Sequence, residues 1–94
     1  MAERITDKFD LESLRRTAKQ LNEIQIWSTC QHDENRELYN MIDGLCRVAH
    51  MYNMVITQEV REGNVITSEP QDYIDSKISY PYTIYKKKSK EVTY

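Results

Sequence analysis

The sequence has little of what usually marks a disulfide-bonded, loop-rich or membrane-spanning chain. Its 94 residues include only two glycines, two prolines and two cysteines. Two cysteines cannot form the multi-bridge framework of a small secreted domain. No apolar run approaches the roughly 18 residues of a membrane span, and no signal peptide opens the chain. We therefore expect a cytoplasmic protein with reduced thiols, in the host cell if the protein is viral, and no membrane association.

Signatures of reaction chemistry are also missing. There is no glycine-rich phosphate loop, nucleophile motif or distinct pair of carboxylates, so we expect a non-enzymatic protein without a cofactor. The cysteines and histidines are Cys30, His32, Cys46 and His50, a set that could suggest zinc. Cys46, however, would lie about 18 Å along a helix that starts near His32. We therefore expect no metal site.

Charge is nearly balanced, with 13 basic and 15 acidic residues and a net charge of −2. A general nucleic-acid-binding protein usually shows a basic surplus, so this balance argues against that class. The length predicts a single domain, residues 1–94.

Apolar residues at helical spacing predict a first helix over residues 11–27. Leu11, Leu14, Ala18, Leu21 and Ile24 recur at steps of three and four, which places them on one side of a helix. Asp10 precedes this stretch and is a good N-cap. Phe9 and Leu14 have the spacing of a hydrophobic staple.

A second, longer helix is predicted over residues 34–60, after a short loop at 28–33 with Asp33 as N-cap. Gly44 lies inside it, which we interpret as close packing by a neighbouring helix. Gly63 is placed to end it in the left-handed conformation. Residues 55–60 are rich in β-branched side chains and could instead begin a β-hairpin with residues 65–68. The unbroken helical period favours the helix.

The C-terminal third changes character. After a possible helical turn at residues 70–75, Ile78, Tyr80, Tyr82 and Ile84 alternate with other residues, which predicts a strand. Pro81 lacks an amide donor and would restrict that strand to an edge. The predicted fold is mainly α (α+β). It is an antiparallel two-helix hairpin (residues 9–62) with a C-terminal tyrosine-rich β-strand or extended arm (residues 63–94).

The apolar side of the second helix is wider than the first helix can cover. We therefore expect a homo-oligomer, since most soluble oligomers are symmetric assemblies of one chain. The alternative is a monomer whose tail folds back over the hairpin. The residues expected at a partner or oligomer interface are Met41, Leu45, Val48, Tyr52, Val55, Tyr80, Tyr82 and Tyr85.

Basic and aromatic side chains suggest a place for a small phosphorylated ligand. A ring could stack on an aromatic side chain while arginine holds the phosphate. The alternative is ordinary surface charge beside core aromatics. The candidate ligand-binding residues are Arg15, Arg16, Lys19, Trp27, Arg36 and Tyr39. The basic run at residues 86–90, after several tyrosines, could also contact nucleic acid.

The segment LESLRRTAKQLNEI, a short loop and a second helix opening with NRE at residues 35–37 resemble the small phage-encoded helical-hairpin proteins that sequester cyclic-nucleotide immune signals. The resemblance covers about half of the chain and does not extend past Gly63. It implies an oligomeric sponge that holds its ligand between subunits.

Three functions follow as hypotheses. The first is a small, phage-encoded anti-defence protein that acts by protein-protein interaction and inhibits a host protein. The second is nucleotide sequestration by an oligomeric sponge for a cyclic nucleotide or similar phosphorylated signal. The third is nucleic-acid binding through the tyrosine- and lysine-rich tail.

Overall fold

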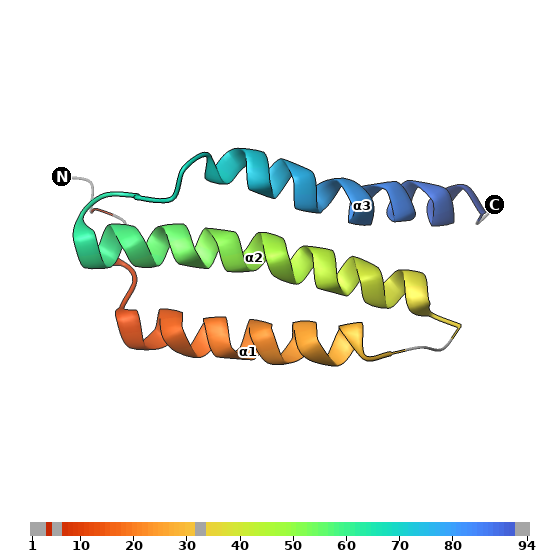
Figure 1. The fold of residues 1–94 in the computed structure, drawn as a ribbon, viewed down its shortest axis with the longest axis horizontal. Coiled ribbons are helices and arrows are strands. Elements are labelled where there is room, and N and C mark those ends of the chain that lie inside the picture. The colour runs from red at the N-terminus through yellow and green to blue at the C-terminus, as the bar shows by residue number, and fades with distance from the viewer. Residues whose placement is uncertain (1–3, 5–6, 32–33, 92–94) are drawn as a thin grey trace.

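The computed structural model describes the whole chain except residues 1–3, 5–6, 32–33 and 92–94. It contains three helices: α1 (Leu11–Thr29), α2 (Arg36–Glu62) and α3 (Pro70–Glu91) (Figure 1). Helices α1 and α2 confirm the two predicted helices, each with small differences at its ends.

Helix α1 begins as its cap predicted. The Asp10 carboxylate accepts a hydrogen bond of 2.8 Å from the backbone N–H of Ser13, which satisfies one of the free donors of the first turn. This bond is also the main reason that the pKa of Asp10 is lowered. The helix continues two residues beyond the predicted end and stops before Cys30.

Helix α2 extends through residues 55–60, so the helical interpretation of that stretch is confirmed and the β-hairpin is wrong. Gly63 ends the helix with φ of 75°, and its N–H donates to the Glu59 carbonyl at 3.0 Å. Asn35 is the N-cap residue, without a side-chain cap bond. The predicted N-cap, Asp33, lies outside the described residues.

The predicted β-strand arm is wrong: its residues form helix α3, and no strand occurs in the described chain. Residues 65–68 belong to the α2–α3 loop. Pro70 opens α3 at the first helical position, where proline needs no N–H partner. Besides the alternation of Ile78, Tyr80, Tyr82 and Ile84, this segment has a second pattern, with the helical steps of four and three residues. The inward-facing members of this second pattern are Pro70, Ile74, Lys77, Pro81, Ile84 and Lys88.

Pro81 is tolerated inside α3 because it packs against a glycine. A Cβ atom placed on Gly44 would lie 2.7 Å from Cγ of Pro81 and 3.2 Å from the Lys77 carbonyl oxygen. That carbonyl is the acceptor that loses its helical N–H partner at proline. The proline ring therefore sits against the bare backbone of α2, which confirms that Gly44 marks close packing by a neighbouring helix.

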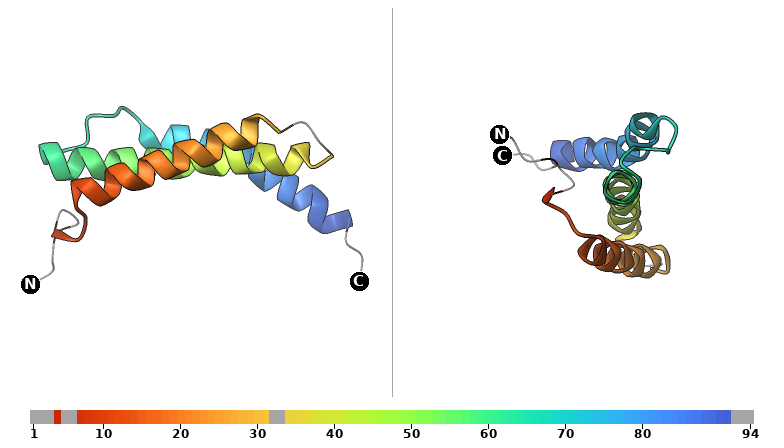
Figure 2. Two further views of the ribbon diagram at one scale, coloured as in Figure 1. Left: turned by 90° about the horizontal axis from the view of Figure 1, so that it is seen from below. Right: turned by 90° about the vertical axis from the view of Figure 1, so that its left-hand side faces the viewer.

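The three helices form one open layer with α2 in the middle. Helices α1 and α3 each pack on α2 but not on each other, and Figure 1 and the right-hand view of Figure 2 show them on opposite sides of it. The radius of gyration is 16.1 Å, against about 12 Å for a compact chain of this length. A layer one helix thick has two broad faces and encloses little.

The core is correspondingly small. Within the described chain six apolar side chains are buried, whereas thirteen large apolar side chains are at least 40 % exposed. The six buried side chains are Leu14, Cys46, Met51, Ile74, Pro81 and Ile84. One chain alone therefore leaves much of its apolar surface in water, which is costly.

Candidate functional site

One side of α2 presents a straight row of exposed apolar side chains. Leu38, Leu45 and Tyr52 are seven residues apart, so they lie on one side of the helix, and they are 43 %, 46 % and 52 % exposed. Neither α1 nor α3 covers this row, because each packs against a different flank of α2. These three residues are the centre of what we call the apolar face.

The α1 side of the apolar face contains a shallow groove of about 620 Å³. Phe9, Leu21, Ala49, Tyr52 and Ile56 are among its lining residues, so the groove is continuous with the α2 row at Tyr52. Ile24 is 48 % exposed and follows Thr17 and Leu21 on the same side of α1. We include Ile24 in the apolar face.

The α3 side of the apolar face is aromatic. The rings of Tyr82 and Tyr85 are 5.9 Å apart, and both side chains are 57 % exposed. Lys86 places its ammonium group 5.6 Å from the centre of the Tyr82 ring. Figure 2 shows the start of α1 and the end of α3 both lying toward one side of the layer. The groove residues at the start of α1 and the Tyr82–Tyr85 pair near the end of α3 therefore border the apolar face. Tyr82 and Tyr85 complete this face.

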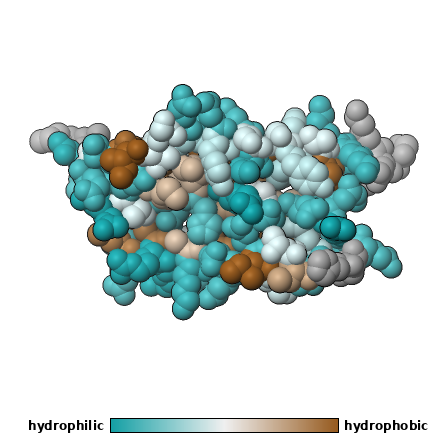
Figure 3. Space-filling model, viewed as in Figure 1, coloured by the Kyte–Doolittle hydropathy of each residue, from teal (hydrophilic) through white to brown (hydrophobic). Residues whose placement is uncertain are grey.

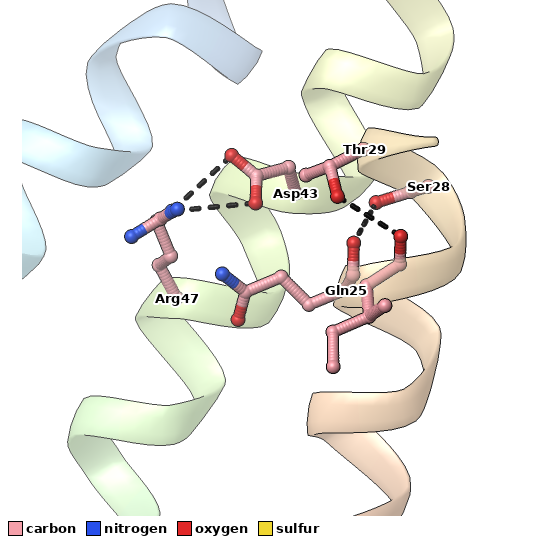
Figure 4. Close-up of polar contacts among 6 residues, drawn as sticks. Gln25, Ser28, Thr29, Asp43 and Arg47 are labelled. Atoms are coloured by element: carbon pink, nitrogen blue, oxygen red, sulfur yellow. Dashed lines mark hydrogen bonds and ion pairs between the residues drawn. The ribbon is translucent and has the colours of Figure 1, made fainter. Parts of the chain in front are cut away.

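The opposite side of the layer is the polar face, shown in Figure 3 as predominantly hydrophilic. Asp43 and Arg47 form an ion pair of 3.2 Å along α2 and lie beside the last turn of α1 (Figure 4). Tyr80 lines a small hollow here together with Arg47 and Gly44. Tyr80 is therefore on the other side of α3 from Tyr82 and Tyr85.

The predicted interface residues are thus divided by the fold. Leu45, Tyr52, Tyr82 and Tyr85 lie on the apolar face, whereas Tyr80 lies on the polar face. The remaining three, Met41, Val48 and Val55, are half-buried, and Val48 and Val55 share the row of Gly44 that meets α3. Their burial follows from the helical form of the tail, which covers one flank of α2.

The predicted ligand-binding residues fall into two groups. Trp27 and Tyr39 meet edge to face with ring centres 5.3 Å apart, and Arg36 begins α2 at that end of the molecule. Arg15, Arg16 and Lys19 lie toward the other end of α1. Arg15 is twelve residues before Trp27, which is about 18 Å along the helix axis. The six residues do not form one site.

Arg15 instead lines a hollow on the polar face that the sequence did not reveal. This hollow, of about 460 Å³, lies where the start of α1 meets the end of α2 and the following loop. Its side chains come from positions up to 55 residues apart, so no local sequence pattern predicts the hollow. The lining residues are Leu11, Arg15, Ala18, His50, Asn53, Met54, Thr57, Gln58, Arg61, Glu62 and Ile66.

The C-terminal lysines are partly engaged within the chain. Lys87 donates to the Glu37 carboxylate at 3.2 Å, and Lys88 lies 3.6 Å from the other oxygen. The hydrogen bond from Lys87 is the main cause that lowers the pKa of Glu37. These contacts hold the end of α3 on the start of α2, so two lysines proposed for nucleic acid face their own chain. The Lys90 side chain lies outside the described residues.

No metal cluster is present in the described part of the chain. Cys30 is exposed and Cys46 is buried, and burial raises the pKa of the Cys46 thiol. His32, the remaining candidate besides His50, lies outside the described residues. None of the helices, as far as they are described, has an apolar stretch sufficient to cross a membrane.

Comparison of the chain with protein-family models, curated proteins and solved structures found no match.

Proposed function

We propose that this chain is a non-enzymatic binding protein that works as a homodimer, in which two copies cover each other's apolar face. The observation that carries the proposal is the uncovered row of Leu38, Leu45 and Tyr52 on the central helix. The dimer would leave two polar faces outward, one for each copy, as surfaces for a further partner.

The exposed area supports a second copy as the occupant. The chain exposes 7247 Å², whereas a compact folded chain of this mass exposes about 5,700 Å². The excess, roughly 1,500 Å², is larger than the ~800 Å² that each partner contributes to a standard interface. A two-fold axis near Leu45, across α2, would place two such rows against each other, as isologous dimers require.

The apolar face is shaped for a helix of the same kind. A straight row with seven-residue spacing is what a facing helix needs for regular packing. The edges formed by Phe9 on one side and Tyr85 on the other would limit how the second α2 can lie. Each copy therefore supplies both the row and the receiving surface.

Two substitutions of matched exposure test this proposal. Leu45 is 46 % exposed on the apolar face, and Tyr80 is 44 % exposed on the polar face. We expect Leu45→Glu to convert the dimer to a monomer in sedimentation velocity, since an unpaired charge would be buried in the interface. Tyr80→Glu should remain dimeric. A monomeric wild-type chain, or equal effects of the two substitutions, would refute the proposal.

Two of the functional hypotheses fit this proposal and stay predictions. One is inhibition of a host protein by a phage-encoded protein, and the other is sequestration of a cyclic nucleotide or similar phosphorylated signal by an oligomeric sponge. Both need an exposed binding surface and no reaction chemistry. The polar face, which remains free in the dimer, is where such a partner would bind.

A further inference from the structure

We infer that the hollow at the start of α1 is a binding site for a small organic anion, a phosphate or carboxylate that carries an apolar or aromatic body. Its volume of about 460 Å³ lies within the range of small-molecule sites. This inference goes beyond the proposed dimer and does not depend on it, because the hollow is on the polar face.

Two arginines make the hollow suitable for an anion. Arg15 comes from α1 and Arg61 from the last turn of α2, and both line the hollow. Neither forms an ion pair or a side-chain hydrogen bond within the described residues, whereas Arg16 and Arg47 donate to Ser13 and Asp43. Two free guanidinium groups can hold one phosphate or carboxylate with paired hydrogen bonds.

The rest of the lining supplies the apolar contact. Leu11, Ala18, Met54 and Ile66 line the same space as the two arginines, so a ring or short aliphatic chain has surface to cover. Met54 and Ile66 are 47 % and 69 % exposed. A ligand lying on them would remove apolar area from water while its charged group stays at the arginines.

The wall of the hollow is held in place by the chain itself. The side-chain oxygen Oε1 of Gln58 accepts hydrogen bonds from the backbone N–H groups of Ile66 and Thr67 at 3.0 and 3.1 Å. The Gln58 amide nitrogen donates to the Thr67 hydroxyl at 2.6 Å. These three bonds keep Ile66, in the α2–α3 loop, beside the end of α2. A site that has its shape before binding loses less conformational entropy when the ligand binds.

Glu62 also lines the hollow, and its carboxylate limits which anions fit. A ligand with negative charge spread over its whole surface would be repelled there. A ligand with its anion at one end, near Arg15 and Arg61, and a neutral body at the other avoids that repulsion. This is why we infer an anion with an apolar body and not a polyanion.

Titration calorimetry with 1-naphthyl phosphate as probe tests the site. The ring without the charge is 1-naphthol, the charge without the ring is inorganic phosphate, and 1-naphthoate replaces phosphate with carboxylate. We expect 1-naphthyl phosphate and 1-naphthoate each to bind about tenfold more tightly than 1-naphthol or inorganic phosphate. The reason is that charge-assisted hydrogen bonds and apolar burial both contribute to the binding free energy.

Arginine variants show whether binding occurs in this hollow. Arg15→Gln and Arg61→Gln should each weaken the anion about tenfold, the effect of losing one charge-assisted contact. Arg16→Gln has the same charge change one residue away and should leave affinity unchanged. Leu45→Glu, which removes the proposed dimer contact, should also retain binding, so the two proposals can fail separately.

Three results would overturn the inference. The first is an absence of saturable binding by both naphthyl anions. The second is 1-naphthol binding as tightly as the anions, which would mean simple attachment to apolar surface. The third is an equal loss of anion affinity in Arg15→Gln and Arg16→Gln, which would mean that the anion is attracted to positive charge in general and not to this hollow.

Discussion

Gly44 and Pro81 bring α2 and α3 closer together than any side chain at position 44 would permit. The absent Cβ atom would lie 2.7 Å from one ring carbon of Pro81 and 3.1 Å from the next. A proline ring cannot rotate away, so the helices themselves would have to separate. The position of α3 on the central helix therefore depends on this pair.

Gly44→Ala should destabilise the protein although alanine is the better helix former. The gain in helix propensity is about 1 kcal/mol, whereas forcing extra volume into a tight contact costs typically 1–3 kcal/mol. We expect a net loss of about 1 kcal/mol in the free energy of unfolding, measured by urea denaturation at fixed protein concentration.

Gly63→Asn is the matched control for Gly44→Ala. Gly63 has φ of 75° and no neighbour within 4 Å of a Cβ atom, and asparagine tolerates the left-handed conformation. It should change stability by about 0.5 kcal/mol or less. A stabilising effect of Gly44→Ala would show that the two helices are not in close contact.

The ion pair between Glu37 and Lys87 predicts a pH dependence of stability. Because the Lys87 hydrogen bond lowers the pKa of Glu37 from 4.5, the folded state binds this proton less readily than the unfolded chain. The contribution is therefore present above the unfolded pKa and is lost as the pH falls through the lowered folded value. Wild type should be more stable than Glu37→Gln at neutral pH, and the difference should vanish in acid.

The magnitude of the Glu37 effect is small because the carboxylate is exposed, and added salt should reduce it further. Glu34→Gln serves as the control, since Glu34 forms no ion pair in the described chain. Thermal unfolding at several pH values measures both variants. A difference between wild type and Glu37→Gln that persists unchanged in acid would rule out the ion pair as its source.

Gln58 is predicted to hold the α2–α3 loop. Gln58→Ala removes three hydrogen bonds to Ile66 and Thr67, each worth about 0.5–1.5 kcal/mol. We expect a loss of about 2 kcal/mol in stability and faster hydrogen exchange at the amides of Ile66 and Thr67. Gln20→Ala, on the exposed side of α1, should change neither. Unchanged exchange at both amides would show that Gln58 does not restrain the loop.

Helices α1 and α2 could be predicted because periodicity, caps and turn residues agreed. Asp10 and Gly63 marked real ends, and the apolar period continued without a break through residues 55–60. Helix α3 was missed, although its inward-facing residues recur at helical steps of four and three. Pro81 argued against a helix, and only contact with Gly44, 37 positions earlier, makes a proline acceptable there.

The candidate sites were predicted in part. The row containing Leu45 and Tyr52 follows from α2 alone, so the sequence located the centre of the apolar face. The separation of Tyr80 from Tyr82 depends on α3 being a helix and was missed. The hollow joins Arg15 to Arg61 through the antiparallel packing of two helices, which residue spacing does not reveal.

The proposed dimer is tested most directly by nuclear Overhauser contacts between copies. A sample mixed from isotope-labelled and unlabelled chains shows only contacts that cross from one copy to the other. The dimer predicts such contacts at the methyl groups of Leu38 and Leu45 and none at Ile66, on the polar face. Contacts at Ile66 instead, or none at either leucine at concentrations where the chain is fully associated, would contradict it.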